Sequence, residues 1–179
     1  MTEKLKEIIE SLIFISVDPL TLEKIRGVLP DVPEPEIVRA AQDLVSTYAA
    51  GGGAIHIIQT AGGYVFSTKP EFDPYVRRLL QIERKSKLSH QALETLSAIA
   101  YHQPVTLPEI SAIRSCDSTY ALHSLLEKKL IKIVGRKDAP GRPLLYRTTD
   151  KFLVYFGLNS LEDLPKEEEL KKLMEEENA

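Results

Sequence analysis

One order of elements occurs twice along this chain of 179 residues, and that repeat constrains the fold more than any other feature. Pro19-Leu20-Thr21-Leu22 with Ile25 matches Pro104-Val105-Thr106-Leu107 with Ile110 at an offset of 85 residues. A second set matches at an offset of 80 residues: Phe66, Thr68 and Phe72 with Tyr146, Thr148 and Phe152. The smaller offset fits shorter loops in the second copy. The repeat therefore predicts two domains of one kind.

The first copy has the pattern of three helices and a hairpin. Apolar residues recur at helical spacing from Leu5 to Ile13, Thr21 can cap a second helix, and a third helix ends at Gly51-Gly52-Gly53. The period then changes to that of strands around a Gly62-Gly63 turn. The predicted elements are helices over 5–13, 21–29 and 33–50 and strands over 54–59 and 64–68. Three helices and a hairpin make a winged helix.

The second copy repeats this plan with clear helix starts. Ser89 can cap its first helix, Thr106-Leu107-Pro108-Glu109 forms a capping box for the second, and Asp117 or Ser118 can cap the third. Strands are expected over 131–134 and 144–147. The predicted fold class is α+β and mainly helical, with two tandem winged-helix domains of three helices plus a β-hairpin wing. The predicted boundaries are 1–82, a linker at 83–88, a second domain at 89–165 and an acidic tail, frayed or disordered, at 166–179.

Composition limits the class of protein. The formal charge of −3 and the pI of about 5.9 do not suit a chain whose affinity comes from neutralising phosphates, although residues 86–165 carry 10 basic against 8 acidic side chains. The single Cys116 excludes an internal disulfide framework and fits a reducing compartment. The first residues contain no apolar leader, and the apolar run from Ser11 to Val17 is too short to span a bilayer. We expect a cytoplasmic protein.

The motifs of common active sites are absent from the sequence. It contains no G-x-x-x-x-G-K-[ST], G-x-S-x-G, H-E-x-x-H or C-x-x-C. The triple glycine at 51–53 follows a helix and precedes a strand, which is the reverse of a phosphate loop. The four histidines are predicted to fall in different elements, without a second metal ligand at a suitable spacing, and Cys116 has no adjacent base. We therefore predict no catalytic residue, no metal site and no cofactor.

The most unusual stretch is the predicted tip of the second hairpin, Gly135-Arg136-Lys137-Asp138-Ala139-Pro140-Gly141-Arg142-Pro143. It contains two glycines, two prolines and three cations in nine residues. One interpretation is a stiff loop with solvated charges. The other is a contact surface for an acidic partner, either phosphate or protein carboxylate. Composition does not separate the two.

Several segments resemble the bacterial segregation and condensation protein B family. They are Leu93-Glu94-Thr95-Leu96, the run from Ile99 to Thr106, Glu109-Ile110 with Ile113-Arg114, and above all the stretches 134–146 and 148–165. Glu7 to Phe14 is similar to the opening helix of that family. The chain departs from the family at Ser115-Cys116 and Thr119-Tyr120, where a Gly-Val pair and a small or acidic dipeptide are expected.

The resemblance implies a non-catalytic, homodimeric subunit that binds the kleisin, segregation and condensation protein A, and through it the SMC ATPase. It further implies that the first domain dimerises and that the second grips the kleisin, at the nucleoid and away from membranes. Any DNA contact would be weak and nonspecific, through Arg136, Lys137 and Arg142. The candidate partner-binding residues are Tyr101, Pro104, Gly135, Arg136, Lys137, Pro140, Gly141, Arg142 and Pro143.

A tandem winged-helix transcription regulator is the main alternative, because many winged helices read DNA. A recognition helix needs Arg, Lys, Asn or Gln facing the groove. The first candidate begins Glu34-Pro35-Glu36 and offers only Arg39 and Gln42, and the second has no Lys or Arg until Lys128 and Lys129. The composition of these two helices therefore favours an adaptor, a subunit that binds the kleisin, over a transcription regulator that reads DNA.

Overall fold

The computed structural model describes the whole chain except residues 1, 82–87, 167–168 and 170–179. Its internal contacts divide the chain into two units, one of Met1–Gln81 with Gly157–Ala179 and one of Ile82–Phe156. Within the described part, no helix combines the length and apolar character needed to cross a membrane. Residues 83–87 of the predicted linker at 83–88 and most of the predicted tail lie outside the described residues.

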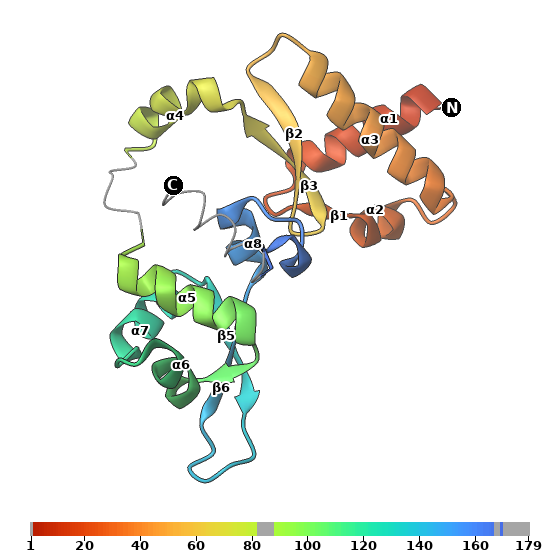
Figure 1. Ribbon diagram of the computed structural model, residues 1–179. Helices are drawn as coiled ribbons and strands as arrows, with labels where there is room; N and C mark the ends of the chain where they lie inside the picture. Colours follow the sequence, from red (N-terminus) through yellow and green to blue (C-terminus); the bar gives the residue numbers. More distant parts are fainter. Residues whose placement is uncertain (1, 82–87, 167–168, 170–179) are drawn as a thin grey trace. The chain divides into compact units, whose positions relative to one another are not determined.

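The first unit packs three helices against a three-stranded antiparallel sheet of order β1-β3-β2 (Figure 1). Its elements are α1 (Thr2–Ile15), β1 (Leu20–Thr21), α2 (Leu22–Val28), α3 (Glu34–Ala50), β2 (Ile55–Thr60), β3 (Gly63–Thr68), a 3-10 turn (Pro70–Phe72) and α4 (Asp73–Leu79). As predicted, the side chain of Thr21 caps α2 by accepting a hydrogen bond from the amide of Lys24. α3 ends at Gly51, whose amide bonds to the carbonyl of Thr47.

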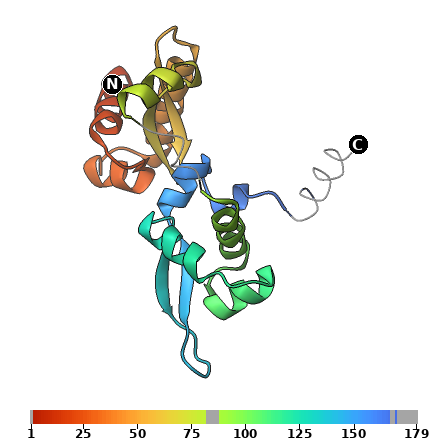
Figure 2. The same cartoon turned by 90° about the vertical axis from the view of Figure 1, so that its left-hand side faces the viewer.

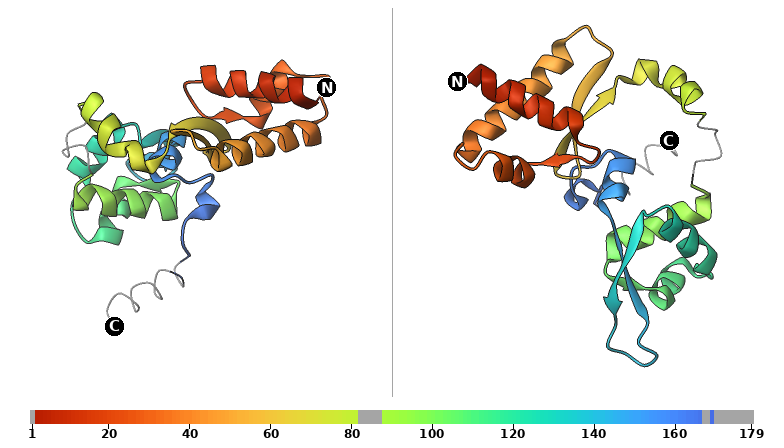
Figure 3. Two further views of the ribbon diagram at one scale, coloured as in Figure 1. Left: turned by 90° about the horizontal axis from the view of Figure 1, so that it is seen from above. Right: turned by 180° about the vertical axis from the view of Figure 1, so that it is seen from behind.

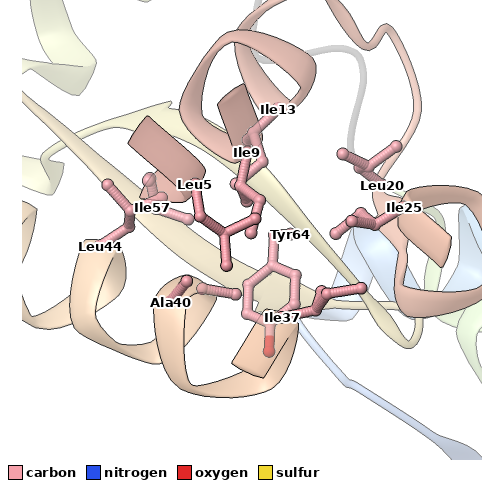
Figure 4. Packing of buried hydrophobic residues seen from close by; sticks show 11 residues of the cluster. Leu5, Ile9, Ile13, Leu20, Ile25, Ile37, Ala40, Leu44, Ile57 and Tyr64 are labelled. Carbon is pink, nitrogen blue, oxygen red and sulfur yellow. The ribbon is translucent and has the colours of Figure 1, made fainter. Parts of the chain in front are cut away.

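The core of the first unit lies between α1, α2, α3 and the sheet. Apolar residues at helical spacing on α1 and α3 meet Ile25 of α2 and Tyr64 of β3 there (Figure 4). The buried members are Leu5, Ile9, Ile13, Leu20, Ile25, Ile37, Ala40, Ala41, Leu44, Ile57 and Tyr64. The helices alone would leave one side of this core exposed, and the sheet covers it.

The second unit repeats the arrangement with a sheet of order β4-β6-β5 (Figure 3). Its elements are α5 (His90–His102), β4 (Val105–Thr106), α6 (Leu107–Arg114), α7 (Thr119–Glu127), β5 (Ile131–Arg136), β6 (Leu144–Thr148) and α8 (Asp150–Phe156). Ser89 caps α5 through the amide of Ala92, and Thr106 with Glu109 forms the predicted capping box. The hairpin of β5 and β6 extends past the helices of its own unit (Figure 2).

The structure confirms two winged-helix domains and adds a strand to each. The matched segments of the repeat become β1 with α2 and β4 with α6, and both Ile25 and Ile110 are fully buried. The two-residue strands β1 and β4 were not predicted. Each pairs with the inner strand of its hairpin, through Leu20 opposite Tyr64 and Val105 opposite Tyr146.

The hairpins confirm the predicted match of Phe66 with Tyr146, because Phe66 lies opposite Ile57 and Tyr146 lies opposite Ile133, two residues from the open end in each case. The short strands pair differently: Tyr64 lies opposite Leu20 of β1, whereas Tyr146 lies opposite Val105 of β4, at an offset of 82 residues. Both tyrosines are buried, and burial raises the pKa of each phenol. The difference of two residues arises because β4 pairs nearer the open end of its hairpin than β1 does.

The segment after α8 belongs to the first unit, although the sequence predicts it in a second domain over 89–165. The carbonyl of Leu158 accepts hydrogen bonds from the amide of Ala61 and the hydroxyl of Thr60, both at 2.9 Å. The Asn159 side chain accepts a bond from the amide of Gly62 at 2.9 Å. We call residues 157–164 the strap. It satisfies the β2–β3 turn, so the second unit is an insertion within the first.

Gly63 marks the closest backbone approach in the first unit. A Cβ atom at this position would lie 2.8 Å from the carbonyl carbons of Pro19 and Leu20. No side chain can move to relieve such a contact, because both neighbours are main-chain atoms. A side chain at position 63 would therefore force β1 away from β3.

We expect Gly63→Ala to lower the free energy of unfolding by about 1–3 kcal/mol, the usual cost of overpacking. Gly27→Ala is the matched control, because Gly27 lies in α2 and a Cβ atom added there would have no neighbour within 4 Å. That substitution should raise stability by about 0.5–1 kcal/mol, since alanine is the better helix former. Urea unfolding measures both changes. Equal effects of the two substitutions would contradict the assigned close approach.

Candidate partner-binding surface

The wing loop from Gly135 to Pro143 has a defined backbone. The amide of Lys137 donates to the carbonyl of Pro143 at 2.8 Å, and the amide of Arg142 donates to the carbonyl of Ala139 at 2.8 Å. The Arg136 guanidinium donates to the carbonyl of Arg142 at 3.0 Å. These bonds join the two sides of the loop and define its backbone conformation. The conformation in turn sets where the prolines and cations lie relative to one another.

The backbone at the turn of the loop is left-handed at two successive residues. Gly141 has φ +79° and Arg142 has φ +43°. Glycine adopts this conformation without strain, whereas arginine rarely does. The exposed Arg142 therefore occupies an unusual backbone conformation at the tip of the wing. Such strain is found more often at functional positions than elsewhere.

The wing is tied to α6 by a charged contact. The Lys137 ammonium bonds to the carboxylate of Glu109, which also accepts bonds from the amide and hydroxyl of Thr106 at 2.9 and 2.7 Å. The bond from Lys137 and those from Thr106 lower the pKa of Glu109 from 4.5 to about 2. One carboxylate therefore caps α6 and holds the wing.

Tyr101 and Pro104 lie outside the wing. Tyr101 is in the last turn of α5 with 39% of its surface exposed, and Pro104 precedes β4. Between them, the side-chain oxygen of Gln103 accepts bonds from the amide and hydroxyl of Thr148 at 2.8 and 2.9 Å. The end of α5 is thus attached to the last residue of β6. The structure joins the seven wing candidates in one loop and leaves Tyr101 and Pro104 in a separate segment.

Sequence reasoning missed a buried arginine beneath the helix–turn–helix of the second unit. The Arg114 guanidinium donates to Thr95 at 2.7 Å, to Ser118 at 2.9 Å and to Glu94 at 2.6 Å. Its side chain is only 7% exposed, and its Nε has no hydrogen-bond partner among the described residues. The bond from Arg114 and the nearby His90 lower the pKa of Glu94. The signal in the sequence was that Arg114 is the one charged residue in the C-terminal half of α6.

The prediction about histidine placement is wrong. His90 and His102 both lie in α5, and the Nδ1 atom of His90 is 2.9 Å from Glu94, one turn further along the helix. His90 and Glu94 supply only two possible ligands, whereas a zinc site in a protein has at least three. Across the described ranges, no cluster of three or more His, Cys, Asp or Glu side chains could hold a metal ion.

The first unit exposes large apolar side chains at the end of α1. Phe14, Ile15 and Val17 are 75%, 76% and 95% exposed. The Phe14 ring also contacts Phe66 of β3, with centroids 6.1 Å apart. By contrast, the apolar stripe of α3 is largely used in the core. Exposed large apolar side chains of the first unit therefore lie at the end of α1, and also on and just after α4, where Leu79 and Leu80 are 81% and 60% exposed, but not along α3.

We expect Glu109→Gln to destabilise the protein near neutral pH and to lose this effect in acid. The folded pKa of Glu109 is depressed, so its contribution is complete above about pH 5 and is lost as the pH falls toward 2. Thermal unfolding at pH 7, 4 and 2.5 should show the variant and the parent converging. Glu7→Gln is the control, because Glu7 is exposed and has no described partner. A difference independent of pH would rule out the charged contact.

Comparison with known protein families gives a match over most of the chain. The model of the family described as segregation and condensation complex subunit ScpB matches residues 7–167. Proteins named segregation and condensation protein B are similar over nearly the full length. The one from Syntrophotalea carbinolica is 42% identical over 178 residues, covering 99% of this chain and 89% of the relative. The one from Symbiobacterium thermophilum is 47% identical, covering 89% and 72%.

Three solved structures are also similar in sequence. A conserved hypothetical protein from Chlorobium tepidum is 40% identical and ScpB from Mycobacterium tuberculosis is 30% identical, each with a TM-score of 0.42 and covering 88% of this chain and 98% of the other. A dimer of the ScpB N-terminal domain complexed with a ScpA peptide is 29% identical, with a TM-score of 0.40, covering 43% of this chain and 95% of the other. By its family match and its curated relatives, this chain belongs to the segregation and condensation complex subunit ScpB family.

Proposed function

We propose that this protein is a non-catalytic subunit of a bacterial SMC complex, which binds the kleisin and supports chromosome condensation and segregation during cell division. The match to the ScpB family across residues 7–167 carries the proposal. The protein would act in the cytoplasm, at the nucleoid, with no cofactor. Its effect on ATP hydrolysis by the SMC subunit would pass through the kleisin.

The second unit is the proposed kleisin-binding part. Its wing is closed by main-chain bonds and anchored by Glu109, so the loop would lose little conformational freedom when a partner binds. Arg142 and Arg136 offer planar groups for carboxylates of the partner. Tyr101 and Pro104 add an aromatic and a rigid apolar surface at the end of α5. An amphipathic helix of the kleisin fits such a mixture of apolar and charged contacts.

The first unit is the proposed dimerisation part. The exposed Phe14 and Ile15 lie in the last turn of α1, and the exposed Val17 follows two residues after the helix. A soluble monomer seldom exposes apolar side chains in a cluster, and a symmetric dimer can bury them against their own copies. The contact between Phe14 and Phe66 would hold this group in a fixed position.

A DNA-reading regulator is the weaker candidate. Over its whole length, Thr119–Glu127, α7 contains neither Lys nor Arg, and Tyr120 is its most exposed large apolar side chain. Base edges in the major groove are read chiefly by Arg, Lys, Asn and Gln. The helix that would enter the groove lacks all four of these residue types.

We expect Tyr101→Ala with Arg142→Ala to weaken kleisin binding at least tenfold, because tyrosine and arginine are the usual energetic centres of interfaces. Calorimetric titration of the full chain with a purified kleisin fragment measures the dissociation constant. The matched control is Tyr75→Ala with Arg78→Ala, an exposed pair of the same residue types on α4. Undiminished binding by the first variant would remove both residues from the interface.

Phe14→Asp with Val17→Asp should shift the protein from dimer to monomer, because charges at these positions would have to be desolvated in a symmetric contact. Sedimentation equilibrium over a range of concentrations detects the shift. Val28→Asp is the control, since Val28 is 57% exposed but lies in another helix. An unchanged dimer would show that self-association uses a different surface.

A further inference from the structure

The base of the second hairpin carries unusual charges. Lys132 of β5 and Arg147 of β6 lie directly opposite each other in the antiparallel register, and both are exposed. Side chains of opposed residues point to the same face of a sheet, about 5 Å apart at Cβ. Two like charges in this position destabilise a hairpin. The protein therefore maintains an unfavourable pair on this face.

The surrounding residues strengthen the positive charge. From Lys128 to Lys151, with both ends included, there are eight basic side chains and only two acidic ones, Asp138 and Asp150. The hydroxyl of Thr149 bonds to the carbonyl of Lys129 at 2.7 Å, which places Lys129 beside the strand end that carries Arg147. We define the basic strip as the exposed residues Lys128, Lys129, Lys132, Arg147 and Lys151.

The basic strip is not compensated by carboxylates of the described chain. Among the residues that the structure describes, none of its five side chains takes part in an ion pair or a hydrogen bond. Lys137, nearer the tip of the same hairpin, is by contrast neutralised by Glu109. The strip is thus available to meet an external anion.

The first unit supplies an internal comparison. In its hairpin, Ile55 pairs with Thr68 as Ile131 pairs with Thr148, so His56 and Ser67 occupy the positions of Lys132 and Arg147. The winged-helix fold therefore does not require cations at these two positions. When a local choice works against stability and the fold does not demand it, function is the expected reason.

We propose that the basic strip binds the phosphate backbone of duplex DNA without regard to sequence. Four of its five members are lysines, which act as point charges toward phosphates and do not read bases. A duplex presents one negative charge for about every 1.7 Å of its axis, so neighbouring phosphates can meet Lys132 and Arg147 together. The absence of cations from α7 fits backbone contact without base recognition. This surface differs from the kleisin-binding wing tip and adds a second partner to the proposed function.

The test is fluorescence anisotropy with the full chain and a labelled random duplex of about 30 base pairs, at several salt concentrations between about 50 and 200 mM. We expect the parent to bind with a dissociation constant in the range of about 1–100 μM near physiological salt. Lys132→Gln with Arg147→Ser should weaken binding at least tenfold at low salt. The slope of log K against log salt should become shallower by about two, because two phosphate contacts are lost.

The matched control is Lys24→Ala with Arg39→Ala, which removes two exposed cations from the first unit and changes the net charge equally. It should leave the salt slope unchanged. Equal losses in both double variants would mean that only total charge matters and would overturn the proposal. The melting temperature adds a readout independent of DNA: relief of the opposed charges should raise it for Lys132→Gln with Arg147→Ser.

Kleisin binding by the same variants separates this proposal from the adaptor role. We expect Lys132→Gln with Arg147→Ser to bind the kleisin fragment as the parent does. If it loses kleisin binding and keeps DNA binding, the strip is a protein contact and the DNA proposal is wrong. If the parent fails to bind duplex DNA even at the lowest salt concentration, the DNA proposal fails while the adaptor role stands.

Discussion

Each domain depends on one small piece of main-chain pairing. A two-residue strand ahead of the second helix bonds to the inner strand of the hairpin, through Leu20 with Tyr64 in one copy and Val105 with Tyr146 in the other. A two-stranded hairpin alone is marginal in water. This third strand attaches the hairpin to the helices and buries a tyrosine against them. The closeness of Gly63 to β1 follows from the same pairing, and so does the position of each wing.

Local signals made most of the fold predictable. Thr21, Ser89 and the Thr106–Glu109 capping box begin their helices as the sequence indicates, because a cap acts within three residues. The strands β1 and β4 escaped prediction because two residues show no periodicity. The strap escaped because its partners at 60–62 lie nearly one hundred residues earlier in the chain. Its sequence gives no sign of which turn it contacts.

The sequence was enough to predict which residues form the candidate surface, but not which contacts hold them in place. The sequence identified the wing from its prolines, glycines and cations, but not that Glu109 holds Lys137 across 28 residues. It also gave Arg136, Lys137 and Arg142 equal standing as free cations. The structure separates them: Lys137 anchors the loop, Arg136 braces its backbone, and Arg142 is held in a left-handed conformation at the tip. Further cations without an ion pair among the described residues lie at the base of the hairpin, at Lys132 and Arg147.

The strap has a consequence for how the protein is made. Because the second unit is inserted in the first, the 75 residues Ile82–Phe156 are synthesised before Leu158 and Asn159 can reach the β2–β3 turn. At about 5–20 residues per second, the ribosome needs roughly 4–15 s for that stretch. During this interval the amides of Ala61 and Gly62 lack the partners that they have in the folded chain. The domain that begins first on the ribosome is therefore completed last.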